Sequence, residues 1–520
     1  MEFRYATSIV LEAHLPFVRG YNKEEALSQA SVFTGEESDF FETISETLLP
    51  LLEVLDRLEN NHIFFRLALV LSPVLCHMLC DENLQNKYLY YIDKQIEFGK
   101  HELEKRTIDQ PEMYKLAEAY YNKIIDRRIT YTERYDKNIL KAFDFYRRRG
   151  KLEILASCAT HSFLPLIGDN PESIQAQMET PVSIYRKNFG STPQGFWLPC
   201  FGWTSAAEPF LRAYNFSYTI LETHGLLFGQ PTPEKGCFYP VKTNGGTYIL
   251  GRDFYSLHEI EKISCNKVYR NNNLDAGYEL SPKLVKPFLS AEGERRKTGY
   301  KYWSKESDVV YNPETASGMI QDHVRMFLEK TIGRLEEASK YMKEPPLCLH
   351  ANSADNFGRF WHEGFEFLET LFRMASHYRD FQFINPSEYI YKQELSSLQV
   401  VVPEFSSNGV NGYAESWLNK TNDRLFSHLA RAMERMTELA ERFPDDTGLK
   451  ERALNQAARE ILLAQASDSL HLQTEACLRN FTTIYEALGS NYISTEWLTN
   501  LEKRHNLFPN INYRVFRRKK

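Results

Sequence analysis

The sequence lacks the features of several classes of protein. Its longest apolar run is interrupted by Ser72, Pro73 and His77, so no stretch is long and apolar enough to span a membrane. Its first residues do not resemble a signal peptide, and it contains no internal repeat and no low-complexity tract. We therefore expect a cytoplasmic protein with no membrane partner.

Cysteine is sparse, and positive charge is not in excess. Eight cysteines are scattered over 520 residues, and only Cys76 and Cys80 lie close together. This spacing argues against a disulfide framework and against a zinc site, which would need further ligands nearby. The chain has 62 Lys and Arg against 69 Asp and Glu, a net charge of −7, which argues against binding a nucleic acid. We expect no metal, no cofactor and no nucleic-acid partner.

Aromatic residues, in contrast, are plentiful. The chain contains 34 Phe, 30 Tyr and 6 Trp, or 13% of its residues. Flat rings on a surface suit the apolar face of a sugar ring, but the same rings are also the ordinary filling of a large core. Composition alone leaves both interpretations open.

The hydrophobic pattern predicts alternating strands and helices over most of the first 400 residues. Strand-like segments occur near residues 5–15, 152–156, 195–198, 218–221, 248–250 and 347–350. Helical spacing occurs at 40–58, 84–149, 171–188 and 314–342. Residues 225–247 and 264–313 are predicted to be long loops or inserted subdomains. This order indicates an α/β fold, either a (β/α) barrel or a doubly wound sheet. We predict one unit at 1–400 and an α-helical unit at 401–520.

Four segments place reactive or polar groups where predicted strands end. They contain Glu12 with His14, then His161, then Cys200, and finally Asp355. In a parallel barrel, the carboxyl ends of the strands carry the active site. Each residue also has a simpler interpretation: a structural histidine, an unreactive thiol in an aromatic pocket, or an aspartate that caps a helix.

These segments resemble the motifs of glycoside hydrolase family 57, and within it the α-1,4-glucan branching enzymes. The resemblance spans almost the whole chain and rests on His-Leu-Pro-Phe-Val-Arg at 14–19, Ala-Thr-His at 159–161, Gly-Phe-Trp-Leu-Pro at 195–199, Gly-Arg-Asp at 251–253, Phe-Gly at 357–358 with Trp361, Glu363 and Gly364, Trp-Leu-Asn at 417–419, and the run 458–468. It implies an incomplete (β/α)7 TIM-like barrel with a C-terminal helical domain that completes the cleft. It also implies an α-glucan or malto-oligosaccharide partner and a retaining reaction that needs no metal ion.

The sequence departs from the family's pattern at the positions that the resemblance makes catalytic. Cys200 stands where the family has its nucleophilic Glu, and Ser353 where it has the acid/base Asp. Glu12 replaces the first histidine of the opening motif, while Asn408 and Ser469 replace two tryptophans. A cysteine side chain is too short to reach the position of a glutamate carboxylate, and a serine hydroxyl has no suitable pKa for general acid catalysis.

These substitutions predict a catalytically inactive or strongly impaired homologue that binds α-glucan. The retained residues that the resemblance assigns to substrate binding are His14, His161, Trp197, Arg252, Asp253, Trp361, Trp417 and Asp468. Packing of the scaffold is the alternative explanation for that set, especially for Trp197 and Trp417. Two other functions remain open: an active branching enzyme or glucanotransferase in which Glu12 and Asp355 act as relocated carboxylates, and a protein-interaction scaffold.

Overall fold

The computed structural model describes residues 3–18, 33–106, 111–281, 295, 297–468 and 472–519. Two residues of the sequence motifs, Arg19 and Ser469, lie outside the described residues, as does part of the predicted loop or subdomain at 264–313.

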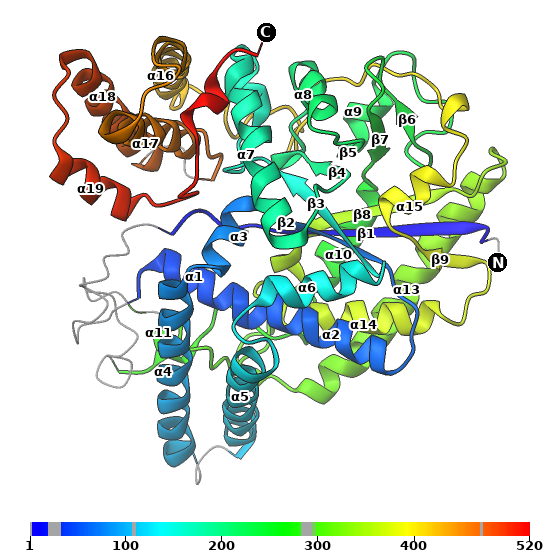
Figure 1. Cartoon of the computed structure of the whole chain (residues 1–520). Coiled ribbons are helices and arrows are strands. Elements are labelled where there is room, and N and C mark those ends of the chain that lie inside the picture. Colours follow the sequence, from blue (N-terminus) through cyan, green and yellow to red (C-terminus); the bar gives the residue numbers. More distant parts are fainter. Residues whose placement is uncertain are drawn as a thin grey trace.

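A single sheet runs through the centre of the molecule (Figure 1). Its strand order is β6-β7-β5-β4-β3-β2-β1-β8, and β9 also pairs with β1. Every pair is parallel except β6 with β7. The strands are β1 (Tyr5–Ala13), β2 (Leu67–Leu71), β3 (Leu152–Ser157), β4 (Gly195–Trp197), β5 (Tyr218–Leu221), β6 (Val241–Lys242), β7 (Tyr248–Gly251), β8 (Leu347–Ser353) and β9 (Phe381–Phe383).

The sheet curls into an incomplete barrel. The backbone N–H of Asp253, just after β7, donates to the carbonyl of Leu349 in β8 at 2.8 Å, so the segment after β7 meets β8 from the other side of the sheet. No strand ladder joins β7 to β8 among the described residues. The predicted α/β class and the incomplete TIM-like barrel are therefore confirmed.

Helices cover the outside of the barrel and form the C-terminal region (Figure 1). They are α1 (Gly35–Thr43), α2 (Leu49–Asn60), α3 (Pro73–Leu79), α4 (Glu82–Arg106), α5 (Pro111–Ile129), α6 (Ile139–Arg148), α7 (Pro171–Phe189), α8 (Glu208–Ala213), α9 (Thr223–Leu227), α10 (Phe254–Ser264), α11 (Ala276–Glu279), α13 (Pro313–Ser339), α14 (Gly364–Ala375), α15 (Pro386–Tyr391), α16 (Asp423–Arg442), α17 (Gly448–Ala464), α18 (Leu472–Ser490) and α19 (Thr495–Arg504). None of the helices in the described part of the chain is long and apolar enough to cross a membrane.

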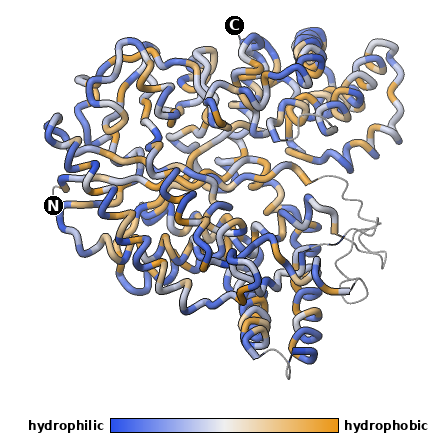
Figure 2. The backbone as a smooth tube through the Cα atoms, turned by 180° about the vertical axis from the view of Figure 1, so that it is seen from behind, coloured by the Kyte–Doolittle hydropathy of each residue, from blue (hydrophilic) through white to orange (hydrophobic). Residues whose placement is uncertain are grey.

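The two faces of the sheet belong to different hydrophobic clusters. In β1, Ala6 and Val10 pack into the cluster that fills the barrel, whereas Ile9 and Leu11 pack against the helices outside. Successive side chains of a strand point to opposite faces, so each residue's position in the strand decides whether it lies inside or outside the barrel. In Figure 2, hydrophobic stretches of the chain gather in the middle of the molecule, where these two clusters lie.

Most of the predicted elements are present, with differences that packing explains. The segment 84–149 folds into three helices, α4, α5 and α6, and the segment 40–58 into α1 and α2 joined by a π-helical turn at Ile44–Leu48. Strand β2 was not predicted because it is fully buried and merges with α3 into one apolar run, and buried strands show no alternation. The boundary at residue 400 stays a prediction.

Tyr185 of α7 is expected to stabilise the carboxyl edge of the sheet. Its buried hydroxyl donates to the carbonyl of Leu71 at 2.7 Å and accepts from the N–H of Ser157 at 3.1 Å, which ties β2 and β3 to the helix. Tyr185→Phe leaves both backbone groups without this partner and should lower the free energy of unfolding in urea by about 1–3 kcal/mol. Tyr341→Phe, at a ring that is 82% exposed, is the control and should change it by less than about 0.5 kcal/mol. Equal effects of the two substitutions would contradict this role.

Candidate functional site

Six polar or reactive residues converge at the carboxyl ends of the strands. Glu12 is the last but one residue of β1 and lies on the same face as Ala6 and Val10, and Ser353 ends β8 on the same face as Leu349. Glu12 and Ser353 are direct partners in the β1–β8 register, so both lie at the rim of the barrel interior. The other four are His14, His161, Cys200 and Asp468, and together we call these six the candidate site.

Two histidines form the centre of the candidate site. The rings of His14 and His161 are stacked, with centroids 3.9 Å apart and an angle of 8° between their planes. Nε2 of His161 lies 2.9 Å from Oε1 of Glu12, and Nδ1 of His14 lies 2.8 Å from Oγ of Ser72. The side chains of both histidines are less than 10% exposed, so these contacts are shielded from solvent.

Asp468 joins both histidines from the segment between α17 and α18. Its Oδ2 lies 2.9 Å from Nε2 of His14, and its Oδ1 lies 3.2 Å from Nδ1 of His161. Burial alone would raise the pKa of Asp468, but the two histidines hold it below its usual range. Burial alone would lower the pKa of His161, but Glu12 and Asp468 hold it well above its usual range. The two carboxylates beside His161 therefore favour its protonated form.

Cys200 lies beside this cluster in a strained backbone conformation. Its φ is 55° and that of His161 is 53°, a region that residues other than glycine rarely adopt. The C-terminal part of the chain holds both residues: Asn408 N donates to the carbonyl of Cys200 at 2.8 Å, and Ser467 Oγ donates to the carbonyl of His161 at 2.6 Å. Burial raises the pKa of the Cys200 thiol to about 11. The thiolate form that nucleophilic attack requires is therefore disfavoured at neutral pH.

Asp355 does not join the candidate site. It is 6% exposed, and its carboxylate accepts from Thr47 Oγ1 at 2.6 Å and lies 2.8 Å from Nε of Arg359, with Thr43 also in contact. Burial raises the pKa of Asp355, which Arg359 and the threonines oppose. These contacts anchor the turn after β8 to the α1–α2 segment. The geometry therefore gives no support to a relocated pair made of Glu12 and Asp355.

Arg252 and Trp417 lie close to the candidate site. Arg252 shares the inner face with Leu250, pairs with Glu222 at 2.5 Å, and lies 4.6 Å from the ring centroid of Phe201, the residue after Cys200. Trp417 is stacked on Phe163 with centroids 4.3 Å apart, in a small cluster that Cys200 contacts.

Asp253, Trp361 and Trp197 are placed differently from what the resemblance implies. Asp253 faces the outer helices, where it caps α10 and pairs with Arg334 at 2.7 Å. Trp361 is 1% exposed and packs on aromatic rings of the core. Trp197 does face the barrel interior, but it is 2% exposed and packs on Phe201. The geometry supports a scaffold role for these three.

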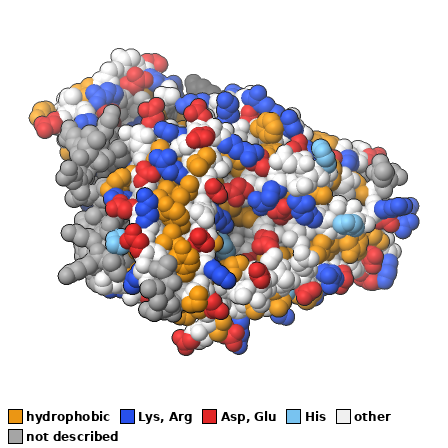
Figure 3. All heavy atoms as spheres, turned by 90° about the horizontal axis from the view of Figure 1, so that it is seen from below, with side chains coloured by type: hydrophobic (Ala, Val, Ile, Leu, Met, Phe, Trp, Pro, Cys, Tyr) orange, Lys and Arg blue, Asp and Glu red, His pale blue; other side chains and the backbone are white. Residues whose placement is uncertain are grey.

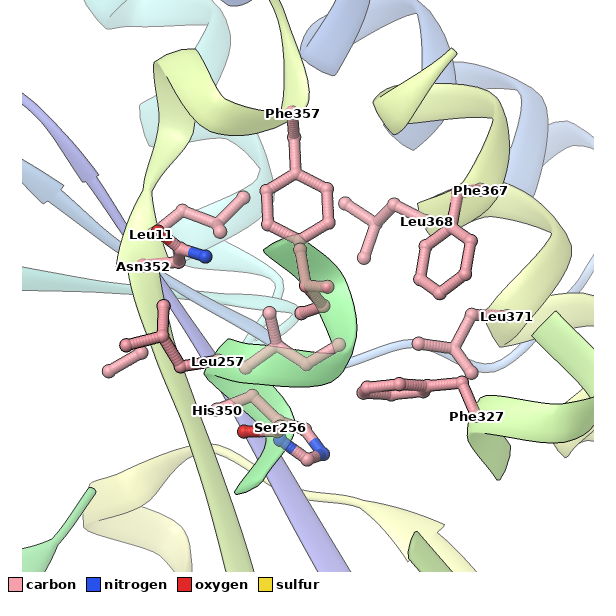
Figure 4. A pocket seen from close by; sticks show the side chains of 13 residues that line it. Leu11, Ser256, Leu257, Phe327, His350, Asn352, Phe357, Phe367, Leu368 and Leu371 are labelled. Carbon is pink, nitrogen blue, oxygen red and sulfur yellow. The ribbon is translucent and has the colours of Figure 1, made fainter. Parts of the chain in front are cut away.

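The cavity drawn in Figure 4 also lies outside the barrel interior. It is lined mainly by apolar side chains of β1, β8, α10, α13 and α14, with the ring of His350 among them. Burial lowers the pKa of His350 to about 4, and neither ring nitrogen has a hydrogen-bond partner within the described residues. The cavity belongs to the packing between sheet and helices and does not extend the candidate site.

The fold brings together residues of metal-ligating types that lie far apart in the sequence. Ligand atoms of His14, His161 and Asp468 all lie within 4.8 Å of one another, as do those of Glu460, Cys477 and His505 in the C-terminal helices. The expectation that no metal is bound rested on the sequence spacing of His and Cys and on the resemblance, and sequence spacing does not register such clusters. In the first group, each histidine already contacts the carboxylate of Asp468, so the geometry does not require an ion.

Sequence reasoning missed several residues that complete the candidate site. Ser72 and Ser467 position the two histidines, Glu222 neutralises Arg252, and Phe163 supports Trp417. Ser72 directly follows β2 and Glu222 directly follows β5. For Ser72 and Glu222, a place directly after a predicted or buried strand is the only sequence signal that could have pointed to a role in the site.

Comparison with known proteins shows what this architecture belongs to. Residues 8–402 match the family model described as glycosyl hydrolase family 57, and residues 428–516 match the model described as the C-terminal region of 1,4-alpha-glucan branching enzyme. The chain belongs to glycosyl hydrolase family 57.

Individual members of the family carry different activities in their names. A 1,4-alpha-glucan branching enzyme of Thermococcus kodakarensis is 26% identical over 488 residues, which cover 89% of this chain and 68% of that protein. The solved structure of the alpha-amylase AmyC from Thermotoga maritima is 30% identical, with a TM-score of 0.90 over 99% of this chain and 100% of that one. A branching enzyme of this family from Pyrococcus horikoshii shares the fold, with 22% identity, a TM-score of 0.85 and coverage of 99% and 97%.

The charge state of His161 should depend on Asp468. Because the pKa of His161 is raised, its ion pairs stabilise the fold fully below pH 6.5, and that stability is lost as the pH rises through the raised pKa. Asp468→Asn removes one carboxylate and should lower the pKa of His161, as followed by NMR of labelled histidine rings and assigned with His161→Gln. Asp253→Asn is the control and should leave the His161 signal unchanged, since Asp253 faces the outer helices. A His161 signal that titrates identically in the parent, in Asp468→Asn and in Asp253→Asn would contradict this account.

Proposed function

We propose that this family 57 member binds α-glucan at the candidate site and does not turn it over. The observation that carries the proposal is a pair of side chains in the candidate site, the thiol of Cys200 and the hydroxyl of Ser353. The resemblance assigns these positions to the nucleophilic and acid/base carboxylates of a retaining enzyme. Such an enzyme needs two carboxyl groups about 5 Å apart, across the bond that is cleaved.

The carboxylates that remain nearby are occupied by other contacts. Glu12 binds His161, Asp468 binds both histidines, and Glu222 binds Arg252. A carboxylate held by a cation is a weaker nucleophile than a free one, because attack requires breaking that pair. The buried thiol of Cys200, with its raised pKa, does not replace the missing group.

The polar groups that would recognise a sugar are present. Imidazole, carboxylate and guanidinium groups at the barrel rim can hydrogen-bond to sugar hydroxyls in several directions. On the loop that contacts Cys200, the ring of Tyr413 is 45% exposed and offers a flat face for a sugar ring. The named activities of the relatives, alpha-amylase and glucan branching, favour an α-1,4-linked glucan as the ligand.

One observation favours a second function, an active enzyme that uses Glu12. Its carboxylate lies at the rim beside Ser353 and contacts His161 at 2.9 Å, so a carboxylate and an imidazolium are adjacent in the candidate site. A site with these two groups could transfer or hydrolyse a glucan if the ion pair opened on binding. The following experiment separates the two functions.

Purified protein incubated with amylose should change neither the iodine colour nor the number of reducing ends. Cys200→Glu combined with Ser353→Asp restores both carboxylates and should produce a measurable change in one of the two signals, whereas either single substitution should not. Circular dichroism would establish that the variants are folded. Activity in the parent that is lost in Glu12→Gln would contradict the proposal and favour the active-enzyme alternative.

Binding should be measurable by calorimetry with maltoheptaose. Tyr413→Ala removes the exposed ring on the loop that contacts Cys200 and should weaken binding about tenfold, which corresponds to ~1.4 kcal/mol. Tyr492→Ala, at a ring that is 76% exposed between α18 and α19, is the control and should bind as the parent does. A parent protein that binds no saccharide would overturn the proposal and favour the interaction scaffold.

A further inference from the structure

Helices α16 and α18 enclose a groove on the C-terminal helical region. It has a volume of about 850 Å³ and lies between two helices that pack side by side at the top of Figure 1. Its lining from α16 includes Arg424, His428, Arg431 and Arg435, and its lining from α18 includes Arg479. The groove is separate from the candidate site.

The basic residues of α16 form a stripe along one face of the helix. Arg424, His428, Arg431 and Arg435 follow one another at spacings of four, three and four residues, which places them on one side of an α-helix. The neighbouring face of α16 is buried and anchors the helix in the core. The stripe is therefore presented to the groove by a rigid element.

Three arginines of the stripe have no carboxylate partner among the described residues, although the guanidinium of Arg435 lies 4.9 Å from the ring centroid of Tyr485. Within the described residues, Arg424, Arg431 and Arg435 form no ion pair, although arginines elsewhere in the chain commonly do. Among the described residues that line the groove, Glu475 is the sole acidic one, and it pairs with Arg479 at 3.7 Å. On the face of the molecule shown in Figure 3, by contrast, acidic and basic side chains are intermixed. The groove is thus strongly positive on a chain whose net charge is −7.

The rest of the lining suits a polar organic ligand. Thr421, Thr482 and Thr483 contribute hydroxyl groups, while Leu425, Leu478 and Phe481 contribute apolar surface. Guanidinium groups bind phosphate through paired hydrogen bonds, and hydroxyls over an apolar floor match a sugar ring. An extended nucleic acid is less well matched, because it would need a longer basic surface with several stacking rings.

The groove adjoins the segment that carries Trp417, which lies close to the candidate site. Asn422, which precedes α16, donates from Nδ2 to the carbonyl of Trp417 at 2.8 Å. Phe426, in the first turns of α16, packs on the cluster that contains Trp417. Cys200 packs on the same cluster. A glucan at the candidate site would therefore have the groove as its neighbour.

We propose that the groove binds a phosphate monoester carried by a sugar. The arginines of the α16 stripe hold the phosphate, and the exposed threonines Thr421, Thr482 and Thr483 hold the sugar. This proposal does not depend on the absence of catalysis at the candidate site. The phosphate monoester could belong to a free sugar phosphate or to a phosphorylated glucan chain.

The test is calorimetric titration of the full chain with glucose 1-phosphate, with glucose and inorganic phosphate as comparison ligands. Glucose 1-phosphate should bind more tightly than either, and its affinity should fall as salt is added. Arg431→Gln combined with Arg435→Gln should weaken it about tenfold or more, since each removes a charged hydrogen-bond donor. Arg442→Gln, an exposed arginine in the last turn of α16 outside the groove, is the matched control and should have no effect.

A second titration distinguishes the two sources of phosphate. Tighter binding of phosphorylated amylopectin than of the same material after phosphatase treatment assigns the groove to glucan-borne phosphate, and binding of glucose 1-phosphate alone assigns it to the free sugar phosphate. Equal affinities for glucose and glucose 1-phosphate, equal loss in the control variant, or binding of a single-stranded oligonucleotide but no sugar phosphate would each overturn the proposal.

Discussion

The contact of the Asp468 carboxylate with both stacked histidines is the interaction on which the candidate site depends. It links the segment after α17 to His14, which follows β1, and to His161, which follows β3. The two imidazole rings are stacked at 3.9 Å, and the single carboxylate of Asp468 contacts a nitrogen of each ring and so fixes their relative positions. Removing the C-terminal region would therefore leave the barrel without its central polar group.

The same dependence extends to the backbone of the site. His161 and Cys200 both adopt a left-handed conformation, which costs free energy for residues other than glycine. Hydrogen bonds from Ser467 and from the N–H of Asn408 hold their carbonyls, and both donors come from the C-terminal part of the chain. The barrel supplies five of the six site residues, and the C-terminal part supplies Asp468 and holds the backbone of His161 and Cys200.

Family membership and the chemistry of the site lead to different expectations. The fold and the two family matches place the chain among enzymes that act on glycosidic bonds. The thiol and the hydroxyl at the barrel rim lack the acidity and the reach that this reaction requires. Our proposal of a glucan-binding protein follows from this difference, and the arginines of α16 that line the groove would give such a protein a second point of contact.

The sequence by itself indicated the α/β class, most of the strands and helices, and several positions at which polar residues follow strands. These features are local: apolar runs, breaks at proline and helical spacing are visible in any short window of the chain. The sequence also indicated Glu12, His14, His161 and Asp468. Only the tertiary structure decided which candidates meet, because the curl of the sheet and the side-chain alternation send Glu12 and Ser353 inward and Asp253 outward. Long-range pairing likewise placed Asp355 in a separate cluster with Thr47 and Arg359, since a contact between residues 308 positions apart leaves no mark on the local pattern.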